Sequence, residues 1–239
     1  MRSLLAIISA FGTVVLGVFL TLSGKPLSVQ AAGGGAISGK IVLVGDVPAA
    51  KKLKVTKDNE KCGSEVTAED LVVAPDRGIQ NAVVTVLGQK GTVTKPDNPP
   101  TLDQKGCVFR PHVLIVPVNT GVDILNSDGI LHNFHTQSSK NTPINRAQPG
   151  FRKRLAETFG QPEIIKVNCD AHSWMSAWIV VTDHPYIAAS DAGGMFKISD
   201  VPPGNHTIEI WHETLGKITK TVSVKAGEEA KLNIEMNKK

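Results

Sequence analysis

Short apolar segments separated by turn-rich stretches recur at regular spacing through the middle of this chain. Within them apolar and polar residues alternate, as where Ile165, Val167 and Cys169 share one face of an extended segment. Such strands are expected at 107–109, 112–116, 121–125, 131–136, 150–156, 163–169 and 177–182. No long helical period appears after residue 31, so the spacing predicts an all-β sandwich.

Further predicted strands flank this middle region on both sides. They are expected at 37–44, 81–88, 195–198, 207–211, 222–224 and 232–236. Residues 51–55 carry three lysines and are predicted to form an exposed edge strand, because edge lysines block unwanted pairing. The polar, proline-containing stretches 89–103 and 137–149 are expected to be loops.

Three residues with metal-binding side chains lie close together in the segment Cys169-Asp170-Ala171-His172-Ser173-Trp174-Met175. Predicted strands precede and follow this segment, so the connection is tight and the sheet holds it at both ends. Cys169 ends the first of these strands and points inward. A further imidazole, His132, follows a turn-rich segment about forty residues upstream.

One thiolate, two imidazoles and a weak thioether form the donor set that suits copper in electron-transfer sites. We therefore predict one copper ion per chain, bound by His132, Cys169, His172 and Met175, with His172 as the most exposed edge of the loop. A lone Cys or Met more often fills a core, but the combined spacing favours the metal. His135 is the alternative to His132.

The other histidines are expected to be structural. His112, His184 and His212 begin, end or follow predicted strands and are predicted to be hydrogen-bonded, with a second metal site as the alternative. Trp174 and Trp178 are predicted to pack around the site rather than to carry chemistry.

The stretch 104–184 resembles the cupredoxins, the family of plastocyanin and amicyanin. The Cys169–Met175 loop is similar to the short ligand loop of amicyanin, and His132 is followed by Asn133, as in plastocyanin. The resemblance implies a Greek-key sandwich that binds type 1 (blue) copper through the four residues named above. It also implies a hydrogen bond from the Asn133 backbone to the thiolate.

The C-terminal segments Asp-x-Gly-Gly-x-Phe (191–196) and Val-Pro-Pro-Gly-Asn-His-Thr-Ile (201–208) resemble the carboxypeptidase-regulatory, or prealbumin-like, β-sandwich. The two resemblances together are similar to exported plastocyanin-like proteins that are sometimes labelled methylamine-utilisation proteins. We therefore predict a cupredoxin domain at 104–184, inserted into a second sandwich formed by 36–103 and 185–239.

The first 31 residues indicate export. Arg2 precedes an uncharged apolar run at 3–24, and Val29-Gln30-Ala31 offers small residues for signal-peptidase cleavage. The alternative is an uncleaved membrane anchor, because the run is close to the ~20 residues that span a bilayer. Either way the chain is predicted to be periplasmic or extracellular.

Charge gives little indication of a nucleic-acid partner. The chain has 26 basic and 22 acidic side chains, and two of the basic ones lie within residues 1–31. The local run Phe151-Arg152-Lys153-Arg154 is the exception and could face an acidic redox partner, although a solvated loop is the simpler interpretation. The predicted partner is a redox protein such as a cytochrome or a dehydrogenase.

The predicted function is outer-sphere, one-electron transfer without enzymatic turnover. The chain has no Gly-x-Ser-x-Gly elbow, no His-Glu-x-x-His motif and no phosphate-binding loop. Two alternatives stay open: a periplasmic copper carrier or chaperone with the same soft ligands, and a non-metal adhesion or carbohydrate-binding sandwich in which Cys169 is merely buried.

An exported chain meets oxidising conditions, in which thiols tend to pair. With Cys169 committed to copper, Cys62 and Cys107 remain and are predicted to form a disulfide. A glycine beside each cysteine eases the close approach of the two backbones. Two unpaired cysteines in separate pockets are the alternative.

Overall fold

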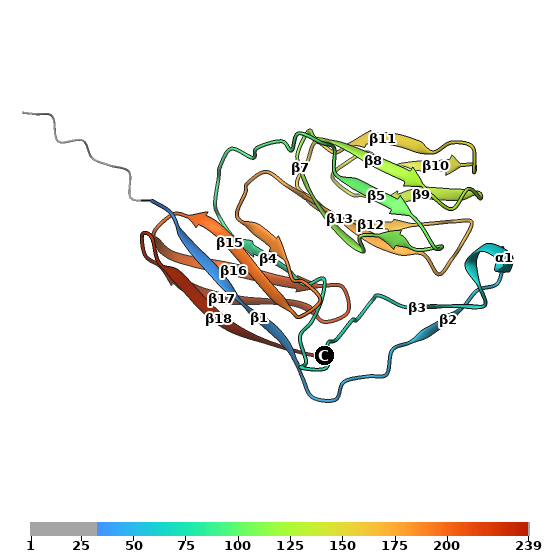
Figure 1. The fold of residues 1–239 in the computed structure, drawn as a ribbon. Coiled ribbons are helices and arrows are strands. Elements are labelled where there is room, and N and C mark those ends of the chain that lie inside the picture. The colour runs from blue at the N-terminus through green and yellow to red at the C-terminus, as the bar shows by residue number, and fades with distance from the viewer. Residues whose placement is uncertain (1–32, 239) are drawn as a thin grey trace, which may run out of the picture. The chain divides into compact units, whose positions relative to one another are not determined.

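The computed structural model describes residues 33–238, so the predicted signal peptide or anchor at 1–31 lies outside the described residues (Figure 1). Strands make up 51% of the described residues and helix 2%, which confirms the predicted all-β class. Within residues 33–238, no helix has the length and the apolar character needed to cross a bilayer.

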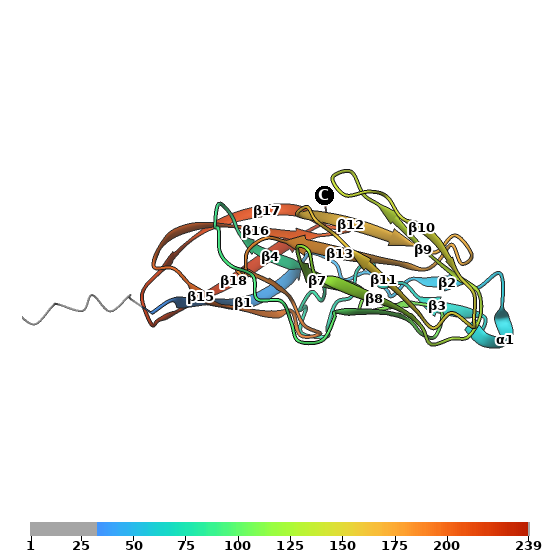
Figure 2. The same cartoon turned by 90° about the horizontal axis from the view of Figure 1, so that it is seen from above.

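Two sheets built from the two ends of the described chain form one sandwich (Figures 1 and 2). The three-stranded sheet has the order β15 (Met195–Val201), β1 (Gly35–Val44) and β18 (Glu229–Asn237). The four-stranded sheet has the order β14 (Ile187–Ala189), β4 (Val83–Val86), β16 (Gly204–His212) and β17 (Gly216–Val224). Both sheets contribute to a single hydrophobic core that includes Ile41, Val84 and Ile210.

The middle of the chain forms a second sandwich. Its five-stranded sheet has the order β10 (Asn145–Gln148), β9 (His132–Gln137), β12 (Glu163–Asn168), β13 (Ser176–Thr182) and β7 (Val113–Pro117). Its four-stranded sheet has the order β11 (Arg154–Thr158), β8 (Gly121–Asn126), β5 (Thr101–Gln104) and β6 (Phe109–Arg110). A separate core that includes Phe109, Phe134 and Ile165 lies between these sheets.

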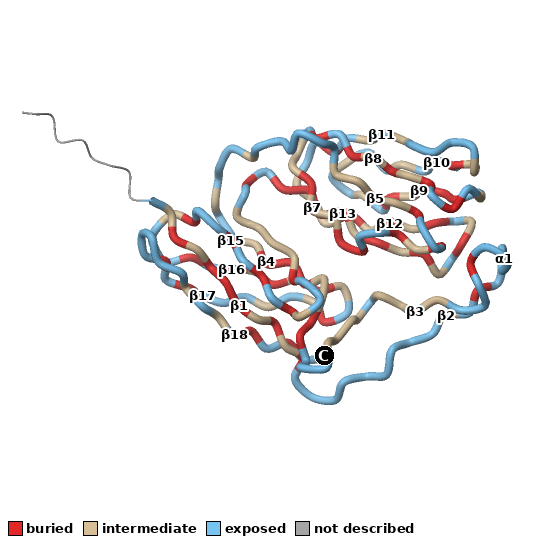
Figure 3. The backbone as a smooth tube through the Cα atoms, in the orientation of Figure 1, coloured by how far each residue is buried: buried red, intermediate tan, exposed pale blue. Residues whose placement is uncertain are grey.

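The burial of each strand follows its period-two sequence. In β8, Val122, Ile124 and Asn126 are buried and the residues between them are not. In β16, the same alternation buries Ile208 and Ile210. Figure 3 shows this alternation as buried positions along both sandwiches. Hydrophobic burial on one face of each strand therefore determines which residues face each core.

A short segment between β1 and β4 packs on the second sandwich. This segment, residues 52–67, is called the strap below; it contains β2 (Lys52–Lys54), α1 (Asn59–Cys62) and β3 (Glu65–Thr67). Val55 and Cys62 of the strap are buried in the second core. The predicted disulfide is present between Cys62 and Cys107, and it ties the strap to the loop before β6.

The predicted boundaries therefore need correction. Residues 36–103 were expected to pack with the C-terminal strands, but the strap packs in the second core and β5 pairs in parallel with β8. The reason is burial: Val55 and Leu102 supply apolar side chains to the middle sandwich. Hence 104–184 is not the whole of that sandwich.

Two further local predictions were wrong, besides the loop expected at 89–103, whose last residues belong to β5 (Thr101–Gln104). Residues 137–149 were expected to be a loop, but Asn145–Gln148 form the edge strand β10 through backbone pairing with β9. The strand expected at 150–156 begins only at Arg154, because a turn closed by Arg152 N–H and the Pro149 carbonyl precedes it. Neither segment has the period-two alternation of apolar residues that marks the other strands.

Candidate metal centre

Three predicted ligands come together at one end of the second sandwich. His132 begins β9, and Cys169 and His172 lie in the loop between β12 and β13. Cys169 N–H donates to the Met175 carbonyl (3.3 Å), and Met175 N–H donates to the His172 carbonyl (3.0 Å). These bonds close the loop so that both of its donor side chains point toward His132.

The donor atoms of these three residues converge. The Cys169 Sγ lies 3.9 Å from His132 Nδ1 and 3.7 Å from His172 Nδ1, and the two Nδ1 atoms are 3.0 Å apart. All three side chains are buried, with exposed fractions of 0–2%. Three soft or borderline donor atoms that converge on one point and are shielded from water suit a copper ion.

The turn that presents His132 is held by a buried amide. Asn126 Nδ2 donates to the Ile130 carbonyl (2.8 Å) and to the Gln148 carbonyl (3.0 Å), and Gly129 N–H donates to Asn126 Oδ1 (3.1 Å). Asn126 is only 1% exposed, so these bonds are shielded from competing water. They fix the chain immediately before His132.

The Cys169 sulfur accepts a hydrogen bond from the Asn133 backbone N–H at 3.3 Å, as the cupredoxin resemblance implies. Burial raises the pKa of the Cys169 thiol, although this N–H donor acts in the opposite direction. Burial lowers the pKa of His132, although the Asp128 carboxylate opposes it. A neutral imidazole is ready to ligate, whereas the thiol releases its proton when a metal binds.

The outer nitrogens of both histidines bond to carboxylates. His132 Nε2 lies 2.9 Å from Asp128 Oδ2, and His172 Nε2 lies 2.8 Å from Asp58 Oδ2. These contacts leave both Nδ1 atoms facing the sulfur. Sequence reasoning missed both carboxylates. The i, i+4 spacing of Asp128 and His132 could have indicated one, but Asp58 lies 114 residues from His172.

The prediction that His172 is the most exposed edge of the loop was wrong, because its exposed fraction is 0%. Asp58 covers its outer nitrogen, and the Trp174 ring packs beside it with a centroid separation of 5.0 Å. Trp174 in turn donates from Nε1 to the Cys107 carbonyl at 3.1 Å. The strap and Trp174 therefore enclose the His172 side chain.

Met175 and His135 complete the set of predicted candidates. Met175 is 1% exposed and belongs to the same core as Cys169. His135 Nδ1 instead contacts Asp170 Oδ1 at 2.9 Å, and its side chain is 35% exposed. The structure brings His132, and not His135, to the sulfur.

The remaining predicted structural histidines are held by hydrogen bonds. His184 and His212 accept from the backbone N–H groups of Tyr186 and Thr214, both at 3.2 Å. His112 bonds through Nε2 to the Glu213 carboxylate. Among residues 33–238, the only further group of three metal-binding side chains combines Asp128 and His132 with the disulfide-bonded Cys107.

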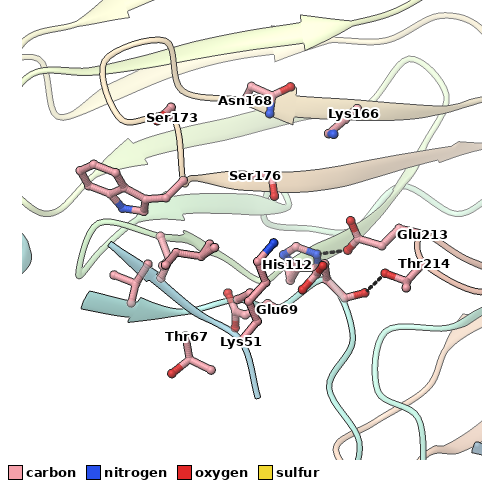
Figure 4. A pocket seen from close by; sticks show the side chains of 16 residues that line it. Lys51, Thr67, Glu69, His112, Lys166, Asn168, Ser173, Ser176, Glu213 and Thr214 are labelled. Atoms are coloured by element: carbon pink, nitrogen blue, oxygen red, sulfur yellow. Dashed lines mark hydrogen bonds and ion pairs between the residues drawn. The ribbon is translucent and has the colours of Figure 1, made fainter. Parts of the chain in front are cut away.

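A cavity of about 350 Å³ lies beside the loop (Figure 4). Lys51, just before the strap, and Thr67, at its end, line one side, and Ser173 and Trp174 of the loop line another. The lining mixes both charges, with Lys166 and Glu69 among the ionisable groups. The three converging donor residues do not line it.

No protein-family model and no curated protein matches the chain. Similar solved structures include a copper-containing nitrite reductase from Thermus scotoductus SA-01, with 26% identity and a TM-score of 0.34 over 40% of this chain and 26% of the reductase. A purple cupredoxin from Nitrosopumilus maritimus has 20% identity and a TM-score of 0.30, over 35% of this chain and 99% of that one.

A point mutant of amicyanin in the Cu(I) form has 16% identity and a TM-score of 0.33, over 41% of this chain and 98% of amicyanin. Each of these similarities covers about 40% of this chain or less. The chain spans only about a quarter of the reductase.

Proposed function

We propose that this protein is an exported type 1 copper protein that transfers single electrons to and from a redox partner. One observation carries the proposal: the Cys169 sulfur and the Nδ1 atoms of His132 and His172 converge within 4.8 Å in a buried site. When bound there, copper would supply the one-electron couple between Cu(I) and Cu(II). Met175 would add a weak thioether donor from the same loop.

The surrounding residues suit electron transfer rather than substrate turnover. His132 is fixed by its strand and by Asp128, while Cys169 and His172 are fixed by a loop that the sheet holds at both ends. A ligand set that is held in place limits the rearrangement that accompanies a change of charge. The burial of all three donors also supports retention of the ion over exchange, which disfavours the copper-carrier alternative.

The test is a redox titration of the copper-loaded protein with metal analysis at each stage. Reversible one-electron cycling with one copper retained per chain is expected. Release of copper on oxidation or reduction would instead support the carrier. A protein that binds no copper would leave the non-metal sandwich as the better account.

The exposed run at 151–154 is proposed as part of the partner-binding surface. Phe151 is 82% exposed, whereas Arg154 is paired with Asp123 at 2.7 Å. Phe151, Arg152 and Lys153 are therefore the residues that could contact an acidic partner. Electron transfer that slows on adding salt in the native protein, but not in an Arg152→Glu, Lys153→Glu variant, is the expected result. Equal salt dependence in both would contradict it.

The sandwich of β1, β4 and β14–β18 is proposed to be the carboxypeptidase-regulatory-like domain, interrupted by the copper-binding sandwich. Its separate hydrophobic core supports this organisation. Native-state hydrogen exchange should then show two groups of amides, one for each core, that open with different free energies. A single shared opening free energy would contradict two domains.

A further inference from the structure

The strap places one carboxylate directly on a proposed copper ligand. Asp58 lies between β2 and α1, and its Oδ2 is 2.8 Å from His172 Nε2. His172 is completely buried and belongs to a loop more than a hundred residues later in the chain. The contact is therefore a product of the tertiary fold and not of local sequence.

The backbone of Asp58 is held in an uncommon conformation. Its φ of 54° and ψ of 38° lie in the left-handed region, which asparagine, aspartate and glycine tolerate best. Its carbonyl accepts from the N–H groups of Lys61 (3.0 Å) and Cys62 (2.9 Å). These bonds lock the position from which the side chain reaches His172.

The disulfide joins the two residues that hydrogen-bond to Asp58 and Asp128. Cys62 binds the Asp58 carbonyl through its N–H, and its disulfide partner Cys107 donates its own N–H to Asp128 Oδ2 at 2.9 Å. Asp128 Oδ2 in turn contacts His132 Nε2. The outer nitrogens of both imidazoles therefore contact carboxylates that the same disulfide supports. Of these two carboxylates, Asp58 is the one that belongs to the strap.

The chemistry of this contact has two consequences. With Nδ1 of His172 directed at Cys169 Sγ and His132 Nδ1, Nε2 carries the hydrogen and donates a hydrogen bond to the Asp58 carboxylate. This bond fixes both the tautomer and the ring orientation of His172. A negative charge at this distance also stabilises the more highly charged state of a bound ion. Removing the charge should therefore favour reduction.

We infer that Asp58 is a positioning residue that fixes His172 for copper and closes the site to solvent on that side. This inference rests on the proposed copper function, but the cover over His172 can be tested without metal. It also means that electrons do not pass through an exposed histidine edge.

The experiment compares Asp58→Gly, Asp58→Asn and a matched control, Asp200→Gly. Glycine removes the side chain without straining the left-handed backbone, and asparagine keeps an acceptor but no charge. Asp200 has a similar φ of 57° and is exposed, and none of its side-chain atoms makes a hydrogen bond in the structure. The readouts are carbethoxylation of His172 by diethyl pyrocarbonate in the apoprotein, copper affinity by chelator competition, and reduction potential.

Asp58→Gly should expose His172 to the reagent and weaken copper binding by about 10- to 100-fold. Asp58→Asn should keep His172 protected while raising the reduction potential, and Asp200→Gly should change nothing. His135, whose side chain is 35% exposed, serves as the internal reference for the reagent. If Asp58→Gly fails to fold, the reduction potential of Asp58→Asn decides: a value above that of wild type supports the inference, and an unchanged value contradicts it.

The inference would be overturned if both Asp58 variants matched wild type in the reactivity of His172, in copper affinity and in reduction potential. So would equal effects in the Asp200 control. A wild-type protein that takes up no copper would refute the proposed function instead, while the protection of His172 in the apoprotein would still test the cover.

Discussion

Replacing Cys62 and Cys107 together by alanine should lower the free energy of unfolding of the apoprotein by about 4 kcal/mol. The two residues are separated by 45 positions, and the chain-entropy relation for a loop of this size gives this figure at 25 °C. Both cysteines are buried in an apolar core, so alanine is preferable to serine, whose hydroxyl would need a partner there. The loss of buried sulfur adds a smaller cost in the same direction.

The assay is urea unfolding of the metal-free protein, with the free energy and its urea dependence fitted by linear extrapolation. Reducing the native protein should destabilise it by a similar amount, because the same covalent bond is removed. A Cys169→Ala variant keeps the disulfide and controls for the loss of a buried thiol. A loss below about 1 kcal/mol in the double variant would refute the view that the disulfide restrains a long loop of the unfolded chain.

Other substitutions test the core, the surface and the loop. Phe134→Ala should cost about 3–5 kcal/mol in urea unfolding, since Phe134 is fully buried; a loss under 1 kcal/mol would contradict this. Burial raises the pKa of Glu163, but donors from Ser139 and Asn141 lower it to about 2, below its ordinary 4.5. Glu163→Gln should therefore cost about 1–2 kcal/mol above pH 4.5, with the difference from wild type shrinking toward pH 2 in acid-unfolding curves; a pH-independent difference would argue against it. Met175→Leu should retain copper and raise the potential measured by voltammetry, because a donor that favours Cu(II) is removed; complete loss of copper would show that the thioether is essential.

Short-range patterns were sufficient for much of the fold. The alternation of Ile165, Val167 and Cys169 predicted an inward-facing sulfur at the end of β12, and all three residues are buried. The all-β class followed from the same alternation. The sequence analysis did not predict β10, because its residues are polar and lack an apolar alternation. Its stability comes from backbone pairing with β9, which a local sequence pattern does not show.

The convergence of the three proposed ligands was predictable from the sequence, whereas the carboxylates that contact them were not. His132, Cys169 and His172 could be named because their chemistry and order along the chain are distinctive. Asp58 could not, because its role depends on how the strap folds over a loop 114 residues away. The same tertiary contact explains why His172 is buried although the sequence predicted an exposed edge.

Titration of the apoprotein with copper, followed by visible absorption, tests the central claim most directly. We predict an intense thiolate-to-copper charge-transfer band that saturates at one copper per chain and is absent in Cys169→Ser. Copper bound without such a band, or a band that survives in Cys169→Ser, would contradict a blue copper site built on His132, Cys169 and His172.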